Sequence, residues 1–197
     1  MAREIGLSRF TLFELTNANQ TQYGAAIDVP WLVNIEVSKT IAEYEAYADN
    51  LAEISSSRET GAELTVEVSS DMPPKLEADI VGKKYSNGAL ISTTDDVKKS
   101  YGAAWETVMS DGNIRRYFYF NCSFSKNEQS NETISDSITA QTYSLTGKAI
   151  PLPTTKELMM VMDEREVKTL LDTTPDNAQE IQDLWDNWFT KAPRPVQ

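Results

Sequence analysis

Hydrophobic and polar residues alternate with a period of two in several stretches of the chain. In residues 33–37 hydrophobic positions alternate with polar ones, among them Glu36. In residues 63–68 they alternate with Glu63 and Glu67. Such alternation is typical of a strand with one buried and one solvated face. The sequence therefore predicts two strands whose solvated faces are acidic.

A hairpin is predicted in the middle of the chain. Residues 101–110 and 114–124 both read as strands, and they flank Ser-Asp-Gly-Asn at 110–113, in which Asp-Gly is a strong turn signal. One face of the second strand is expected to carry four apolar side chains, Phe118, Phe120, Cys122 and Phe124. Residues 9–15 and 137–150 are further candidate strands, the latter ended by Pro151 and Pro153.

Two helices are predicted. The first has Asp71 as its N-cap, prolines in its first turn and Gly82 as its C-terminal stop. The second covers about residues 175–189 and has an apolar stripe at spacings of three and four, formed by Ile181, Leu184, Trp185, Trp188 and Phe189. We expect this stripe to dock on the sheet or on a neighbouring subunit.

These elements indicate a mainly β fold of the α+β class. Many strands, a short helix between strands and a terminal helix favour a β-sandwich or flattened barrel with helices packed on it. We expect residues 1–150 to form this domain, and residues 151–197 to form a strand/helix extension packed on it.

The segment between the two acidic strands, residues 38–61, is too long for a simple hairpin turn. It is rich in serine, alternates only loosely and is weakly apolar. Long connections in compact domains are usually functional or mobile. We therefore expect residues 40–60 to be a mobile functional connection.

Composition excludes several functions. The 18 Lys+Arg stand against 30 Asp+Glu, a net charge of −12, which disfavours binding to phosphates. Histidine is absent, which removes His-based triads, His-ligated zinc and His proton relays. The single cysteine allows no internal disulfide, and no leader or membrane span is evident, so a cytoplasmic location is expected.

Four local patterns could indicate a chemical function, but each also fits an ordinary structural role. Ser123 and Lys126 match S-x-x-K but end a strand instead of opening a helix. Asp95 and Asp96 could ligate magnesium but fit a turn better. Glu43 and Glu45 could act as a glycosidase pair, although a solvated strand face is the plainer reading. Aromatic residues could form a stacking platform, but core or interface packing is favoured, and this group consists of Trp31, Trp105, Trp185, Trp188, Tyr117 and Tyr119.

An ordered set of segments extends from about Gly6 to Phe189 and comprises residues 29–37, 47–50, 63–68, 75–82, 87–91, 116–120, 137–138, 143–147 and 187–189. In this order the segments resemble the major tail proteins of the phi13-type family of long-tailed bacteriophages. The set includes Tyr-Ala-Asp at 47–49 ahead of a polar loop. No single segment is specific; the order of the set carries the resemblance.

This resemblance implies a non-enzymatic virion protein without cofactors: a tail tube subunit of a siphophage-like particle. Such subunits form hexameric rings that stack into a DNA-ejection channel, and their partners are the tape measure, tail terminator and distal tail proteins. Genomic DNA passes through without specific binding, and assembly occurs in the host cytoplasm. Under this reading Glu36, Glu63 and Glu67 line the channel. The ring-stacking loop would then include Glu43, Glu45, Tyr47, Leu51, Ile54 and Arg58.

Three alternatives remain open. The chain could be a tube or terminator subunit of another phage-derived particle. It could also be a carbohydrate-binding β-sandwich, with Trp105 or Tyr119 in contact with the glycan, or a carboxylate-dependent hydrolase. The last six residues have no assigned role.

Overall fold

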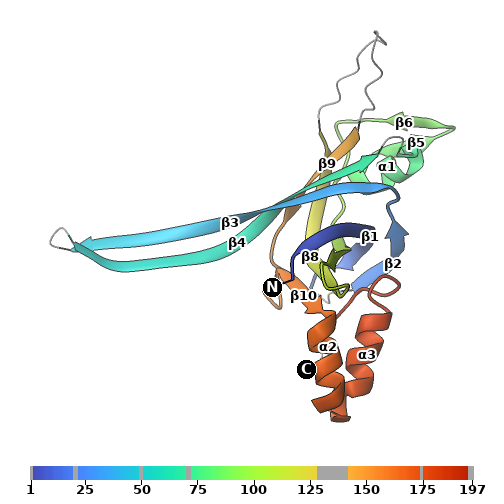
Figure 1. The fold of residues 1–197 in the computed structure, drawn as a ribbon. Helices are drawn as coiled ribbons and strands as arrows, with labels where there is room; N and C mark the ends of the chain where they lie inside the picture. The colour runs from blue at the N-terminus through green and yellow to red at the C-terminus, as the bar shows by residue number, and fades with distance from the viewer. Residues whose placement is uncertain are drawn as a thin grey trace, which may run out of the picture.

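The computed structural model describes residues 2–19, 22–48, 51–69, 72–127, 142–173 and 175–194; the side chains of residues 45–48, 51–55 and 175 lie outside that description. Antiparallel strands dominate it and helices are short, so the mainly β, α+β prediction is confirmed (Figure 1). The main sheet contains β1 (Glu4–Asn17), β2 (Gln22–Asp28), β3 (Leu32–Ala48), β4 (Leu51–Ser69), β7 (Tyr101–Met109), β8 (Ile114–Lys126), β9 (Thr142–Ala149) and β10 (Met159–Asp163). The other elements are α1 (Pro74–Val81), β5 (Lys84–Ser86), β6 (Ala89–Ile91), α2 (Glu164–Thr173), the 3-10 turn η1 (Pro175–Asn177) and α3 (Ala178–Asp186).

The main sheet is open. Its strands follow the order β2-β1-β7-β8-β9-β4-β3, and β10 pairs with the part of β8 that β9 leaves free. Within the described residues, β2 is paired only with β1, and β3 is paired only with β4. Both outer strands therefore present unpaired backbone groups, which are able to pair with another chain.

The hairpin of β7 and β8 forms where it was predicted. Its turn is closed by the Met109 amide, which donates to the Asn113 carbonyl at 2.8 Å. Gly112 has a φ of 83°, a left-handed conformation that suits glycine. The Asp-Gly signal thus marks the turn correctly.

The expectation that four residues of β8 share one face is wrong, because β8 contains an extra residue. Tyr101 pairs with Cys122, but Ala103 pairs with Tyr119, so three residues of β8 oppose two of β7. Such a bulge reverses the alternation. Phe118 and Phe120 consequently lie in one apolar cluster, with Phe13, Leu152 and Trp188, whereas Cys122 and Phe124 lie in the other, with Phe10, Leu64, Val66 and Tyr101.

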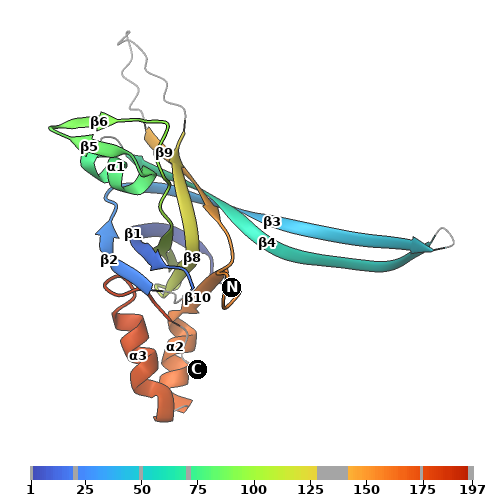
Figure 2. The same ribbon diagram turned by 180° about the vertical axis from the view of Figure 1, so that it is seen from behind.

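The segment expected as a connection between two strands is instead a continuation of both. β3 and β4 remain paired from Leu32–Val68 out to Ala48–Leu51 and form an arm that projects from the body of the molecule in both views (Figures 1 and 2). The loose alternation of residues 40–49 is consistent with a ribbon that has no core on either side. We call residues 40–48 and 51–60 the arm.

Helix α1 ends as predicted, at Gly82, whose φ is 78° and whose amide donates to the Ala78 carbonyl. A Cβ at this position would come within 2.1 Å of the Val97 carbonyl oxygen, so only glycine fits. The proposed cap, Asp71, lies outside the described residues, and Pro73 at the N-cap makes no side-chain hydrogen bond. Buried Glu77 pairs with Lys126 of β8 at 3.3 Å and joins the helix to the sheet.

The C-terminal region differs from the prediction in detail. The single helix predicted at about 175–189 is a 3-10 turn, the shorter helix α3 and a turn at residues 187–190. Helix α2 and the strands β2 and β10 were not predicted. β1 extends beyond both ends of the predicted residues 9–15, and β9 begins at Thr142, with residues 137–141 outside the described part. α2 and α3 lie side by side at the end of the body away from α1 (Figure 2).

Candidate assembly surfaces

One face of the sheet is polar across four strands. In the β3–β4 register, Asn34 lies opposite Glu67, Glu36 opposite Thr65, and Ser38 opposite Glu63. Paired residues in an antiparallel ladder point to the same side. Leu64, Val66 and Val68, which alternate with these residues in β4, are buried in the core. Glu36, Glu63 and Glu67 therefore share the face of the ribbon that points away from the core.

The same polar face continues onto β9 and β8, which alternation within β3 and β4 does not predict. Glu63 pairs with Lys148, Thr65 with Thr146, and Glu67 with Ser144. Ser123 and Ser125 of β8 lie opposite Lys148 and Thr146 in turn. We call this surface the polar face; it is formed by Asn34, Glu36, Ser38, Glu63, Thr65, Glu67, Ser144, Thr146, Lys148, Ser123 and Ser125. It carries three carboxylates, one ammonium and otherwise neutral hydroxyl and amide groups.

The arm contains the residues assigned to ring stacking. Glu43 and Arg58 are exposed, whereas the side chains of Glu45, Tyr47, Leu51 and Ile54 lie outside the described residues. At the base of the arm, Lys39 pairs with Glu59 at 3.1 Å. Farther out, Ile41 and Tyr44 are more than half exposed. An isolated two-stranded ribbon is marginally stable in water, so an arm with exposed apolar groups is suited to a second molecule.

The predicted helix stripe packs within the same chain. Trp188 is 0% exposed and lies edge-to-face with Phe118, at 6.5 Å between ring centroids. Ile181 and Phe189 are also buried, and Leu184 and Trp185 are half-buried. Trp188 and Phe189, in the turn after α3, therefore lie against β1 and β8, whereas α3 itself packs mainly on α2.

A buried arginine fixes the C-terminal helix to the sheet. Arg116 of β8 pairs with Glu106 of β7 at 3.2 Å, and both side chains are about nine-tenths buried. Its guanidinium also donates to the Trp185 carbonyl and lies 4.0 Å from the centroid of the Trp185 ring. Burial lowers the pKa of Arg116, and Glu106 opposes this shift. No local pattern predicts this link, because its members are far apart in sequence.

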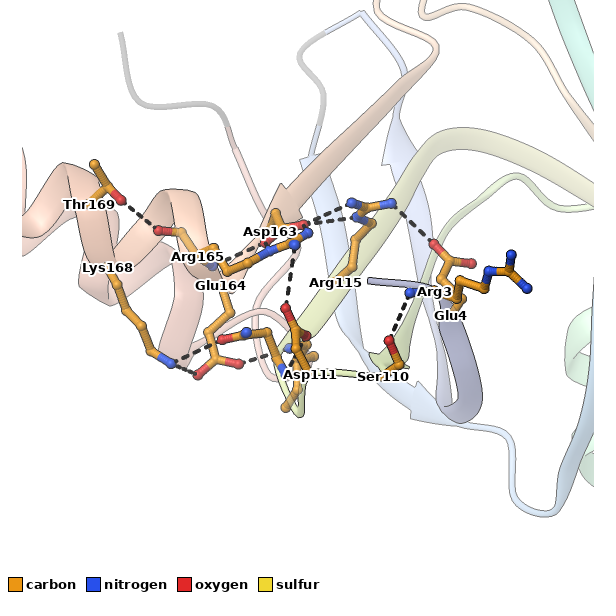
Figure 3. Close-up of polar contacts among 12 residues, drawn as sticks. Arg3, Glu4, Ser110, Asp111, Arg115, Asp163, Glu164, Arg165, Lys168 and Thr169 are labelled. Carbon is orange, nitrogen blue, oxygen red and sulfur yellow. Dashed lines mark hydrogen bonds and ion pairs between the residues drawn. The ribbon is translucent and has the colours of Figure 1, made fainter. Parts of the chain in front are cut away.

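An ionic network joins the start of α2 to the rest of the molecule (Figure 3). Asp163 accepts from Arg165 at 2.6 Å and from Arg115 at 2.9 Å, and Arg115 also reaches Glu4 at 3.3 Å. Hydrogen bonds from Arg165 and then Arg115 hold the pKa of Asp163 below its ordinary value. Arg165 also contacts Asp111 of the hairpin turn.

A second carboxylate strengthens this junction. Glu164 accepts from the Ile114 amide at 2.8 Å and pairs with Lys168 at 2.7 Å (Figure 3). Its pKa is lowered, first by the Lys168 hydrogen bond. The helical pair is therefore anchored to the hairpin and to the N-terminal strand by charges that sequence spacing does not bring together.

A groove of about 320 Å³ opens beside the inner side of β3. Its apolar lining comes from β1, β3, β7, β8 and β10 and includes Leu7, Ile35, Val37, Trp105, Tyr117 and Met159. Trp105 is stacked with Tyr117 and Tyr119, at centroid distances of 5.2 and 5.6 Å. Trp105 and Tyr119 are both at most 4% exposed, so their rings offer no open platform for a sugar.

Residues of the remaining chemical motifs make contacts within the fold. Ser123 and Lys126 lie in β8, and Lys126 pairs with Glu77. Asp96 accepts from the Thr93 amide and hydroxyl in a turn. Cys122 is buried in the core, as predicted, and burial raises the pKa of its thiol. Among the described residues, no three potential ligands cluster to hold a metal ion, and no helix is long and apolar enough to cross a membrane.

The comparisons with known proteins give only weak similarity, and it is to solved structures. No family model matches the chain, and no curated protein matches it. A chain in the cryo-EM structure of the anti-feeding prophage baseplate, symmetrised sixfold, aligns with 82% of this chain and 97% of its own length. The TM-score is 0.37 and the identity 11%, too low to carry an argument about this protein. The phi13-type resemblance therefore stays a prediction.

Proposed function

We propose that this chain is a non-enzymatic structural subunit of a phage-type tail tube, with the polar face lining the channel. The observation that carries the proposal is that face: four adjacent strands present carboxylates, hydroxyls and amides on the side away from the core. A channel that conducts DNA should not bind its phosphates, and a surface with more carboxylates than cations repels them.

Two features support closure of copies into a ring. The sheet ends in two outer strands, β2 and β3, each with an edge that no described strand pairs. Pairing between copies would satisfy these edges, and a contact between different surfaces generates a ring when its rotation closes. Hexameric symmetry comes from the family resemblance alone. A tube or terminator ring of another phage-derived particle would use the same features.

The arm supports stacking of such rings. Residues 40–60 contain five acidic residues and one basic residue, and the described side chains there are mostly exposed. A paired arm that extends beyond the body can reach a copy outside its own ring. We propose that the arm contacts the surface of such a copy in the next ring.

Electron microscopy of concentrated protein tests the proposal directly. Rings or tubes are expected, whereas monomers at all concentrations would contradict it. Particles that carry Glu36→Lys, Glu63→Lys and Glu67→Lys together should assemble but eject DNA slowly or not at all. The matched control is a triple lysine substitution at exposed Asp172, Asp176 and Asp183 on the helical end, which should leave ejection normal. Normal ejection by the channel-face triple variant would remove the polar face from the channel.

A further inference from the structure

Trp31, between β2 and β3, has an unusual backbone and an unusual environment. Its φ is 59°, in the left-handed region that bulky residues rarely adopt. Its carbonyl accepts from the Ser69 amide at 2.8 Å, and its side chain is 62% exposed. In the described part of the chain, no residue hydrogen-bonds to its indole N–H. A strained residue that displays a large aromatic group to solvent suggests a function outside the free subunit.

The sequence around Trp31 is uncharged and partly exposed. Residues 29–33 are Val-Pro-Trp-Leu-Val, in which Pro30 and Val33 are exposed. The free edge of β3 begins immediately after Trp31. An apolar anchor beside an unpaired strand edge is suited to a protein–protein contact.

The groove beside β3 offers matching chemistry. Thr107 lines it, is 7% exposed and has a buried hydroxyl oxygen without a hydrogen-bond partner among the described residues. The charged residues at the groove, Glu4 and Lys39, are already paired with Arg115 and Glu59. A neutral side chain with one hydrogen-bond donor could therefore enter without leaving a charge unpaired.

We propose that Trp31 of one copy inserts into this groove of a second copy, where its indole N–H donates to the Thr107 hydroxyl. The contact is heterologous, because anchor and groove are different surfaces of the same chain. Charge favours this occupant: each copy carries −12, and both proposed surfaces are either uncharged or compensated within the chain. The inference rests on the proposed self-assembly and names one of its contacts.

The first test separates assembly from folding with Trp31→Asn. Asparagine adopts a left-handed φ more readily than tryptophan, so the dilute subunit should melt no lower than the parent. The concentration needed for association, measured by sedimentation, should rise about tenfold or more, because a buried Trp anchor is lost. Trp31→Phe should recover part of this loss, and Val97→Ala, at an exposed position outside both proposed surfaces, should change association little. Parental association of Trp31→Asn would overturn the proposal.

Thr107→Val tests the hydrogen bond inside the groove. Replacement of a buried, unpartnered hydroxyl by a methyl group of similar shape should leave the melting temperature unchanged or raise it. Association should weaken several-fold, because the indole N–H loses its acceptor. Unchanged association would overturn the hydrogen bond to Thr107.

A mixed disulfide tests the location. Val33→Cys lies beside the anchor and Val37→Cys lines the groove, while Cys122 is buried and should react little. When the two variants are mixed under mild oxidation, with one of them size-tagged, the disulfide should join tagged to untagged chains. A disulfide that joins only identical variants, or none at all, would place the contact or its partner elsewhere. This measurement needs no tubes, so it reports on the contact even if microscopy contradicts the proposed function.

Discussion

The C-terminal helices and the β3–β4 arm differ in where their groups find partners. At the helical end, Trp188 is buried against the sheet, and Arg116 joins Glu106 to the Trp185 carbonyl within one chain. In the arm, Ile41 and Tyr44 are exposed, and within the described part of the chain one edge of β3 has no partner strand. The comparison indicates that the helical end stabilises the chain itself, whereas the arm contributes little to that stability and, under the proposed function, serves association.

The largest effect is expected when the arm is shortened. Ala42 lies opposite Arg58 in the register, so residues 43–57 can be replaced by Asn-Gly, which closes a two-residue hairpin. Because most described side chains removed are exposed, the melting temperature of the dilute subunit should change little. Tubes should be lost in electron micrographs. Tubes of parental length would assign the arm to some other role, and a large loss of melting temperature would erase the contrast with the helical end.

The helical end should respond in the opposite way. Trp188→Ala removes a fully buried ring, which costs about 3–5 kcal/mol. In a protein of this size that corresponds to a fall of roughly 6–20 °C in melting temperature. Trp31→Ala, at an exposed tryptophan, is the control and should shift it little. If the two variants melt alike, burial in the helical end does not stabilise the subunit as argued.

How far the sequence predicts these two regions depends on whether the signal is local. The β7–β8 turn and the acidic faces of β3 and β4 follow from residue type and alternation. The bulge at Phe120–Cys122 could not be predicted, because it arises from pairing with β7. β10 reads Met-Met-Val-Met-Asp and lacks the alternation that identifies a half-buried strand. The arm lacks the alternation that identifies a strand pair, because neither of its faces meets a core.

At the helical end, one feature could be predicted from the sequence and another could not. Helix α2 had a usable signal, since Val167, Leu170 and Leu171 recur at helical spacing. The contact between Arg116 and Trp185 had no local sequence signal, because it depends on how a helix distant in sequence packs against the sheet. Similarly, the extension of the polar face onto β9 follows from strand order, which alternation within one strand does not reveal.

Arg116→Met sharpens the comparison further, with a somewhat smaller expected effect. It leaves the Glu106 carboxylate buried without its cation, which should cost about 3 kcal/mol of unfolding free energy. Addition of Glu106→Gln should restore most of that loss, because the charge that needed a partner is gone. Lys168→Met breaks an exposed pair with Glu164 on α2 and should cost at most about 0.5 kcal/mol. Equal losses in chemical denaturation from Arg116→Met and Lys168→Met would contradict a special role for the buried arginine.

The last effect, at the ionic junction, is expected to depend on pH. Arg165 and Arg115 hold the pKa of Asp163 in the fold below the value of about 3.9 expected for an unfolded chain. A depressed carboxyl pKa stabilises the fold above the unfolded value, and this contribution is lost as the pH falls through the folded value. Asp163→Asn should therefore melt below the parent at pH 7, and the difference should narrow as the pH falls below about 4. Asp172→Asn, at an exposed position of α2, should have the same melting temperature as the parent at each pH. If the difference in melting temperature between Asp163→Asn and the parent stays constant from pH 7 to pH 2, the junction stabilises the helical end by shape and not by charge.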